Sequence, residues 1–448
     1  MSLSVPAVSP ADPGDAPGAA PGAPARVAGV IFAKLFPNKA EPLRGVFVAE
    51  QLRATSAAVR WAVVAPVPWV PRLLARALGK PYVAGDGNLD GVEVRHPRYP
   101  VLPRRLLYGT VAPLIALTAR RAFERACASV GAAFVHAHDL YPSGAAARRL
   151  CERAGLPYVL TVHGSDLYSN LGNPRWRAEI QDAARGARAV ICVGSRLAYD
   201  CVNELGIPAN RTVVIPDTYD AAQFTFVKRT ERRSVEGEGA GGPQGTRLVS
   251  VGRLSREKGH DVLLRALADL RSRGVAVTLR VVGDGPERAA LDSLAENLGL
   301  ADAVEFAGAL PPGQLPDAYA HADAFVLPSR REGFGVALVE AMATGLPVVA
   351  TRSGGPSDIV SPSDGILVAP DDPGALADGI AGSIENRAAY DSHAIALRAR
   401  DRFAPHVVGE RLTRLYAEVL AGGPLSGTVD AAVPAGPPSG STGGDARG

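Results

Sequence analysis

The chain has 448 residues, which is too long for one typical hydrophobic core, so two domains are expected. Its 48 lysines and arginines and 45 aspartates and glutamates give a net charge of +3, a balance that argues against a nucleic-acid-binding protein. Its four cysteines lack metal-ligand spacing and suit a reducing compartment, and no run of about 18 apolar residues predicts a membrane span.

Residues 1–25 are rich in Pro, Ala and Gly and lack the basic start and apolar core of a secretion signal. We therefore expect a disordered tail there and a cytoplasmic protein. A second disordered tail is predicted for residues 422–448.

From residue 26, apolar strands alternate with amphipathic helices, which predicts a doubly wound, largely parallel sheet in residues 26–227. The predicted strands are residues 27–32, 61–67, 92–96, 134–137, 158–162, 190–193 and 213–215. The predicted helices begin near Gly45 and continue with residues 69–78, 106–128, 143–154, 173–187 and 196–205.

Residues 228–246 are charged, rich in Gly and nearly free of apolar residues, so they are predicted to be a linker. The alternation then restarts and predicts a second domain at residues 247–404. Its strands are residues 248–251, 278–282, 304–306, 324–327, 346–350 and 366–368, and its helices 260–273, 287–298, 314–322, 336–344, 373–385 and 389–402, followed by a last helix at 405–420. Two such Rossmann-like halves face each other across a cleft at the carboxyl ends of their strands.

A glycine-containing loop at residues 329–335 leads into the helix at 336–344, a place that favours an anion, most often a phosphate. Glu332 lies in this loop and Glu340 inside the apolar helix. A buried carboxylate is costly unless it is hydrogen-bonded. Glu340 is therefore either paired with an internal Arg or backbone group, or accepts hydrogen bonds from the hydroxyls of a ligand.

Arg253 and Lys258 follow the first strand of the second domain, so both are expected at the cleft, where they suit a diphosphate. The alternative is a solvated basic turn. Residues 283–288 (GDGPER) fail the dinucleotide pattern because Arg288 stands where Gly or Ala belongs. They predict a tight turn near the ligand.

Histidines and acids end two strands of the first domain, at residues 134–139 and 161–166. His136 and His138 share a strand face, which leaves a metal site open beside the favoured roles of positioning groups or filling the core. His163, next to a glycine, is the better candidate at a reacting centre. Gly45 allows close approach by a ligand or the opposite domain, or is a simple turn. The chain has no Asp-x-Asp pair, so a phosphate clamp made of protein groups is favoured over a metal-bridged one.

With these residues in view, the chain resembles the retaining glycosyltransferases of family four, which have the GT-B fold, over roughly residues 27–420. The motifs that carry the resemblance are the Gly45 loop, HGSD at residues 163–166, VGRLSREKG at 251–259, VVGDGP at 281–286, and Glu332 with Glu340 eight positions later. The resemblance implies an α/β fold of two Rossmann-like doubly wound domains, with a helix at residues 405–421 that crosses back onto the first domain.

By this resemblance the second domain binds a nucleoside diphosphate sugar as donor substrate, with no cofactor and no metal ion. Arg253 and Lys258 would hold the diphosphate, Glu340 the ribose and Glu332 the sugar, while His163 would lie beside the anomeric carbon. The predicted donor-binding residues are Gly252, Arg253, Lys258, Gly283, Glu332, Gly333, Phe334, Gly335 and Glu340. The predicted catalytic residues are His163, Arg253, Lys258 and Glu332, and the predicted acceptor-side residues are Gly45, His138, Asp139 and Asp166.

Two positions depart from the family pattern. Residues 216–220 read Pro-Asp-Thr-Tyr-Asp where Asn-Gly is common after the last strand of the first domain, so acceptor specificity or the hinge is expected to differ. Arg331 replaces an aromatic or small residue, and either contacts phosphate or faces water.

The implied activity is transfer of a hexosyl or N-acetylhexosaminyl group to a glycan, lipid-linked or small-molecule acceptor, as in polysaccharide biosynthesis. A nucleotide-sugar 2-epimerase and a non-catalytic carbohydrate-binding scaffold are the alternatives, whereas an NAD oxidoreductase lacks its fingerprint. Basic, partly apolar stretches at residues 72–78 and 104–125 suggest peripheral contact with the inner membrane face. The interpretation we favour is that this helical face packs on the sheet.

Overall fold

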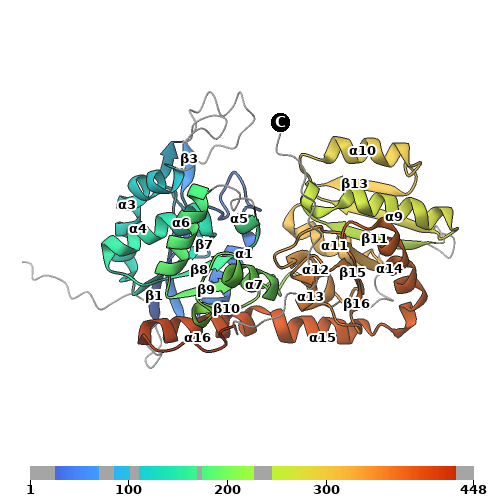
Figure 1. The fold of residues 1–448 in the computed structure, drawn as a ribbon. Helices are drawn as coiled ribbons and strands as arrows, with labels where there is room; N and C mark the ends of the chain where they lie inside the picture. The colour runs from blue at the N-terminus through green and yellow to red at the C-terminus, as the bar shows by residue number, and fades with distance from the viewer. Residues whose placement is uncertain (1–25, 70–84, 101–109, 169–173, 227–244, 430–448) are drawn as a thin grey trace, which may run out of the picture.

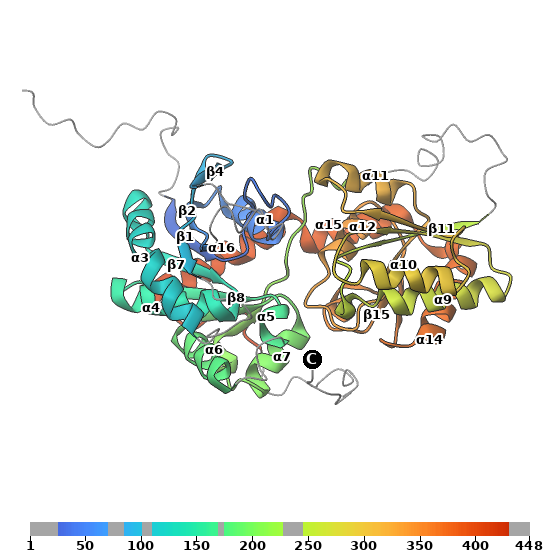
Figure 2. The same ribbon diagram turned by 90° about the horizontal axis from the view of Figure 1, so that it is seen from above.

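The computed structural model describes residues 26–69, 85–100, 110–168, 174–226 and 245–429, and these form two parallel sheets with helices on both faces (Figure 1). The first sheet and its helices lie on the left in both views, and the second on the right (Figure 2). The linker predicted at residues 228–246 lies outside the described residues up to position 244, and Thr246 already opens a strand.

The first sheet has eight strands in the order β10-β9-β8-β7-β1-β2-β5-β4, all parallel except the β4–β5 pair. The strands are β1 (Val27–Ala33), β2 (Val59–Val64), β4 (Gly87–Leu89), β5 (Val92–Arg95), β7 (Phe134–His138), β8 (Tyr158–Val162), β9 (Ala189–Cys192) and β10 (Thr212–Val214). The helices are α1 (Val46–Thr55), α3 (Val111–Val130), α4 (Ala145–Ala154), α5 (Ser165–Tyr168), α6 (Pro174–Gly186) and α7 (Ser195–Asn203). Side chains alternate between the faces of β1: Val30 and Phe32 pack under α3, α4 and α6, whereas Ile31 packs under α1.

The second sheet has six parallel strands in the order β13-β12-β11-β14-β15-β16. They are β11 (Thr246–Val251), β12 (Val277–Val282), β13 (Val304–Gly308), β14 (Ala324–Leu327), β15 (Val348–Thr351) and β16 (Gly365–Val368). The helices are α9 (His260–Ser272), α10 (Arg288–Asn297), α11 (Leu315–Ala320), α12 (Val336–Ala343), α13 (Pro356–Ile359), α14 (Pro373–Glu385) and α15 (Ser392–Phe403). On β14, Phe325 faces α11 and α12 while Val326 faces α9 and α14. The prediction of two largely parallel α/β sheets is therefore confirmed.

Several local predictions were wrong. Residues 67–69 form strand β3 (Val67–Trp69), which pairs with β6 (Arg98–Pro100), instead of continuing β2 or starting a helix; the rest of the helix predicted at 69–78 lies outside the described residues. Strand β5 was predicted, at residues 92–96, but its hairpin partner β4 was missed, because β4 has only three residues, one of them Gly. The tail predicted from residue 422 differs from the structure up to Val429: Ser426 bonds Glu418, and Thr428 pairs with Val213.

Helix α3 packs against the first sheet, which agrees with the interpretation favoured for the stretch at residues 104–125. Ile115 and Phe123 are buried, whereas Leu117 is 71% exposed and Arg121 and Arg125 face outward. Residues 72–78 and 101–109 lie outside the described part of the chain. No helix among the described residues is long and apolar enough to cross a membrane.

Within the described residues, the chain passes between the two halves twice, and these two passages are tied together. Ile215 still packs in the first half, whereas the Phe224 ring contacts Tyr319 of α11, with 5.7 Å between ring centroids. The second half therefore begins earlier than the predicted boundary at residue 227. The return passage follows Phe403, whose carbonyl oxygen accepts a buried hydrogen bond from the Thr218 hydroxyl at 2.7 Å.

The last helix, α16 (Pro405–Ala421), runs back under the first sheet, as predicted for residues 405–421 (Figure 1). Leu412 and Tyr416 lie in the same core as Leu52 of α1. The two helices approach closely at Gly409, where an added Cβ would lie 2.1 Å from the carbonyl oxygen of Ala54. Glycine at this position therefore sets the distance between α16 and the first domain.

We expect Gly409→Ala to lower the free energy of unfolding by about 1–3 kcal/mol, because the helices must separate to admit the methyl group. Gly382→Ala in α14 is the matched control: its Cβ would meet Ile366 at 3.4 Å, and alanine is the better helix former. The midpoint of urea unfolding measures both effects. Equal midpoints for the two variants would contradict a close α1–α16 contact.

Candidate active site

The glycine loop before α12 exposes backbone donors at the carboxyl end of β14. The loop is held by Ser353, whose carbonyl accepts the Glu332 N–H at 2.9 Å. Within the described part of the chain, the N–H groups of Gly333, Phe334 and Gly335 donate no hydrogen bond to the protein. Such free amides at a helix N-terminus attract an anion.

Lys258 and Glu332 form an ion pair beside this loop. The Lys258 ammonium lies 2.6 Å from Glu332 Oε2, which also accepts a hydrogen bond from the Ser329 hydroxyl at 3.1 Å. Lys258 reaches this position because Gly259 allows its turn to pack on β14: a Cβ there would lie 2.1 Å from the Pro328 carbonyl oxygen. Arg253, from the same loop, is exposed and makes no side-chain hydrogen bond or ion pair among the described residues.

Gly283 allows its loop to touch the neighbouring loop at Gly252. A Cβ on Gly283 would lie 1.9 Å from the Gly252 carbonyl oxygen. The Gly283 N–H donates to the Gly308 carbonyl at 2.8 Å. The structure thus gives Gly283 a packing role, whereas a Cβ on Gly252 would meet only His260, at 4.0 Å; the predicted contact of both glycines with a donor stays a prediction.

Glu340 lies on α12, more than one turn after the free amides. Its Oε2 accepts a hydrogen bond from the buried hydroxyl of Tyr319 at 2.9 Å, so its internal partner is neither an Arg nor a backbone group. Burial raises the pKa of Glu340 to about 7; the Tyr319 hydrogen bond opposes this shift, and the charges of Asp220 and Glu50 add to it.

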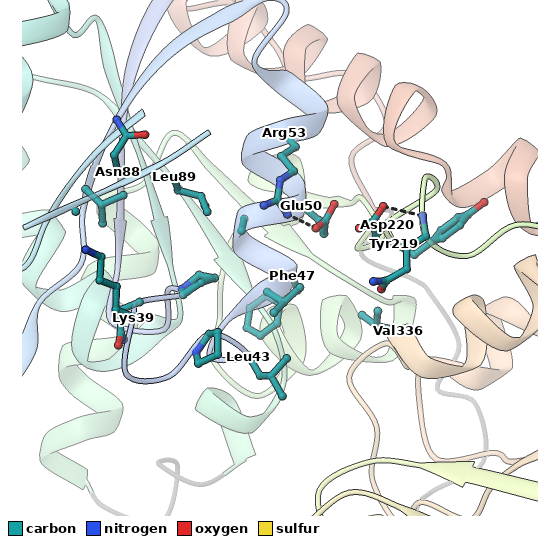
Figure 3. Close-up of a pocket in the computed structure, with 18 of the residues that line it drawn as sticks. Lys39, Leu43, Phe47, Glu50, Arg53, Asn88, Leu89, Tyr219, Asp220 and Val336 are labelled. Carbon is teal, nitrogen blue, oxygen red and sulfur yellow. Dashed lines mark hydrogen bonds and ion pairs between the residues drawn. The ribbon is translucent and has the colours of Figure 1, made fainter. Parts of the chain in front are cut away.

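A cavity of about 1030 Å³ opens between the two halves next to Glu340 (Figure 3). Its walls come from the loop before α1, α1 itself, the β4–β5 hairpin, the passage after β10 and α12. The labelled lining residues are Lys39, Leu43, Phe47, Glu50, Arg53, Asn88, Leu89, Tyr219, Asp220 and Val336. Sequence reasoning missed Glu50 and Arg53, although Glu50 follows Phe47 by three residues and so shares its helix face.

The structure shows local partners for two of the predicted acceptor-side residues, and the acceptor-side role of all four stays a prediction. A Cβ on Gly45, which has φ 66°, would lie 2.4 Å from the Leu35 carbonyl oxygen, so its close neighbour is the chain's own backbone. Asp139 accepts hydrogen bonds from the Ser143 amide at 2.9 Å and hydroxyl at 2.7 Å, which hold the turn into α4. The backbone of Asp166 lies in α5, and its side chain is outside the described part of the structure.

Three histidines stack at the carboxyl ends of β7 and β8. His138 is buried between His136 and His163, with ring centroids 4.2 Å and 5.4 Å away. His136 bonds Thr161 and Tyr416, so it satisfies the core. Among the described residues, no group of three or more His, Cys, Asp or Glu side chains is placed to hold a metal ion.

The two halves touch directly at the glycine loop. A Cβ on Gly333 would lie 2.0 Å from the His163 carbonyl oxygen. Asp358 of α13 accepts the Ser195 N–H at the start of α7, at 2.7 Å. Arg331 is exposed, which agrees with the second of its two expected positions, and its guanidinium also stacks over the Tyr168 ring at 4.5 Å.

Comparisons with known proteins agree on a family. The model of glycosyl transferases group 1 matches residues 242–402, and that of glycosyltransferase family 4 matches residues 84–223. TuaC of Bacillus subtilis, assigned to teichuronic acid biosynthesis as a glycosyltransferase, is 30% identical over 77% of this chain and 86% of its own length. The 2-deoxystreptamine glucosyltransferase of Streptomyces kanamyceticus is 32% identical over 51% of this chain and 60% of its own.

Solved structures share the fold. Sucrose-phosphate synthase from Thermosynechococcus elongatus superposes with a TM-score of 0.72 at 20% identity, over 89% of this chain and 100% of that one. Anabaena HepE, solved with UDP and glucose, gives a TM-score of 0.65 at 21% identity, with the same coverage. The predicted GT-B arrangement of two Rossmann-like domains is thereby confirmed.

The raised pKa of Glu340 should make stability depend on pH. The folded state holds this proton up to about pH 7 and the unfolded state only up to about 4.5, so Glu340 destabilises the fold progressively as pH rises through that window. We expect Glu340→Gln to gain on the order of 2 kcal/mol in unfolding free energy relative to wild type between pH 5 and pH 8. Glu296→Gln on the exposed side of α10 is the control. If the difference in unfolding free energy between wild type and Glu340→Gln stayed constant across this pH range, the raised pKa of Glu340 would be contradicted.

Proposed function

Since this chain belongs to the group 1 glycosyltransferases of family 4, we propose that it moves a hexosyl or N-acetylhexosaminyl group from a nucleoside diphosphate sugar to an acceptor hydroxyl. The configuration at the anomeric carbon is retained, and no metal ion or cofactor takes part. The observation that carries the proposal is the pairing, on one short helix, of free amides at the N-terminus with a buried carboxylate further along.

The spacing along α12 fits a nucleotide. Glu340 lies four residues after Val336, which corresponds to roughly 6 Å along the helix axis. A ribose with its hydroxyls on Glu340 would therefore direct its phosphates toward the amides of Gly333, Phe334 and Gly335. Val336 and Glu340 both line the cavity, which leaves room for the nucleoside.

The leaving diphosphate would gain charge as the bond between the anomeric carbon and its oxygen breaks. Arg253 and Lys258, from the loop after β11, supply positive charge there, and Glu332 orients the Lys258 ammonium until the donor sugar reaches it. The acceptor hydroxyl attacks the same face, and its proton passes to the leaving phosphate oxygen. The protein's contribution is positioning and electrostatic stabilisation.

We propose that the acceptor enters the cavity from the side of α1 and the β4–β5 hairpin. Glu50 is buried and ion-paired with Arg53, and Asp220 lies opposite on the passage between the halves (Figure 3). Carboxylates and a nearby cation in one pocket favour a molecule with many hydroxyl groups. Two relatives are named after molecules of this kind, teichuronic acid and 2-deoxystreptamine. The same proposal places the protein in the cytoplasm, where nucleotide sugars are supplied.

The donor class can be measured by titrating the purified protein with UDP, GDP, ADP and dTDP without added metal. We expect one nucleotide to bind, and Glu340→Ala to lose that binding because the ribose hydroxyls lose their acceptor. Glu296→Ala is the matched control for loss of a glutamate. If a folded wild-type protein binds none of the four, the donor site proposed here is wrong.

Removing either cation should slow the transfer. We expect Arg253→Ala and Lys258→Ala to lower kcat by roughly 10²–10³-fold, because the leaving group loses a stabilising charge. Arg256→Ala, in the same loop and exposed, is the control for a lost charge. Product formation is measured with and without acceptor. Unchanged turnover in both cation variants would contradict a role of Arg253 and Lys258 at the leaving diphosphate. Conversion of the donor sugar without acceptor would indicate the 2-epimerase instead.

A further inference from the structure

Asp217, at one of the two departures from the family pattern, lies against the predicted catalytic histidine. It is 4% exposed, and its Oδ2 lies 3.5 Å from Nδ1 of His163. Its Oδ1 accepts a hydrogen bond from the Gln51 amide nitrogen of α1 at 2.8 Å. On the other side of the ring, Nε2 of His163 lies 3.1 Å from Nδ1 of His138. Both nitrogens of the imidazole therefore face protein groups.

The partners determine where the protons lie. An ionised carboxylate only accepts, so the proton of a neutral His163 belongs on Nδ1, facing Asp217. Nε2 is then bare and accepts from Nδ1–H of His138. This leaves Nε2 of His138 bare as well, and that atom is buried and has no hydrogen-bond partner in the described structure.

The opposite arrangement is costlier. It would place an N–H without an acceptor on the buried Nε2 of His138, and it would turn the bare Nδ1 of His163 toward the Asp217 carboxylate, whose negative charge repels a lone pair. Burial lowers the pKa of His138 well below its ordinary value and that of His136 to about 3, so neither ring carries a second proton. Phe47 on His163, and Thr161 and Tyr416 on His136, add uncharged contacts to this cluster.

We propose that Asp217 is a positioning residue that holds His163 in the tautomer protonated on Nδ1, with His138 as the donor to Nε2. His163 then exchanges no proton with the substrate. Its ring is fixed so that its backbone carbonyl keeps its place against Gly333, where the donor sugar is proposed to react. The catalytic consequence rests on the proposed function, whereas the tautomer does not.

Protein labelled with ¹⁵N in its eight histidines provides the direct test by long-range ¹H–¹⁵N NMR, with the His163 signal identified by its loss in His163→Gln. In wild type we expect the ¹⁵N chemical shift of His163 Nε2 to be that of an unprotonated ring nitrogen. Asp217→Ala should give a mixture of tautomers. Asp217→Asn should restore the wild-type tautomer, because its amide oxygen can accept from Nδ1–H once the Gln51 amide has turned to offer its unpartnered oxygen.

Kinetics give the second readout. Asp217→Ala should lower kcat by roughly 10- to 100-fold, as for other residues that orient a functional group, while nucleotide affinity and KM for the donor stay within about threefold. Asp217→Asn should recover most of kcat. A wild-type proton on Nε2, or an Asp217→Ala variant with unchanged tautomer and kcat, overturns the proposal. If no nucleotide binds even to wild type, the proposed function fails, and the NMR spectrum still decides the tautomer.

Discussion

The two domains meet through backbone, and the active site depends on that contact. Gly333 lies against the His163 carbonyl, and on the other side of the loop a Cβ on Gly355 would lie 2.4 Å from Phe334 Cα. Any side chain at Gly333 would push the domains apart. The free amides of the loop and the backbone of His163 are thus neighbours only because this layer carries no side chains.

The site also holds charge where the fold would be more stable without it. Glu340 interrupts an apolar helix face and keeps one hydrogen bond, from Tyr319, while Glu50 and Asp220 face the same cavity. Leucine or glutamine in place of these acids would give a more stable fold. Proteins commonly depart from local rules of stability at the groups that bind ligands, and three acids around one cavity are such a departure.

The sequence predicted the alternation of strands and helices well, because apolar runs and glycine stops such as Gly345 are local signals. It also predicted that Lys258 and Glu332 share a site, since both follow strands of one parallel sheet. It did not predict their direct ion pair, or the link between His163 and Asp217, because those distances depend on how loops from separate strands settle. The β4–β5 hairpin was too short to show a period, and the cavity it borders could not be anticipated. Tyr319 as the partner of Glu340 required knowing that α11 and α12 pack on the same face.

The hydrogen bond from Thr218 to Phe403 ties together the only described places where the chain passes between domains. Two linking segments joined at one point favour a hinge motion, in which one domain rotates about that point. Sliding of one domain past the other would break the bond that joins the segments. The Arg331–Tyr168 stack and the Ser195–Asp358 bond do not lie on these passages, so a rotation that opens the cleft would break them and leave the Thr218 bond intact. The Thr218 hydroxyl, at the edge of the cavity, therefore helps to determine how the two domains can move relative to each other.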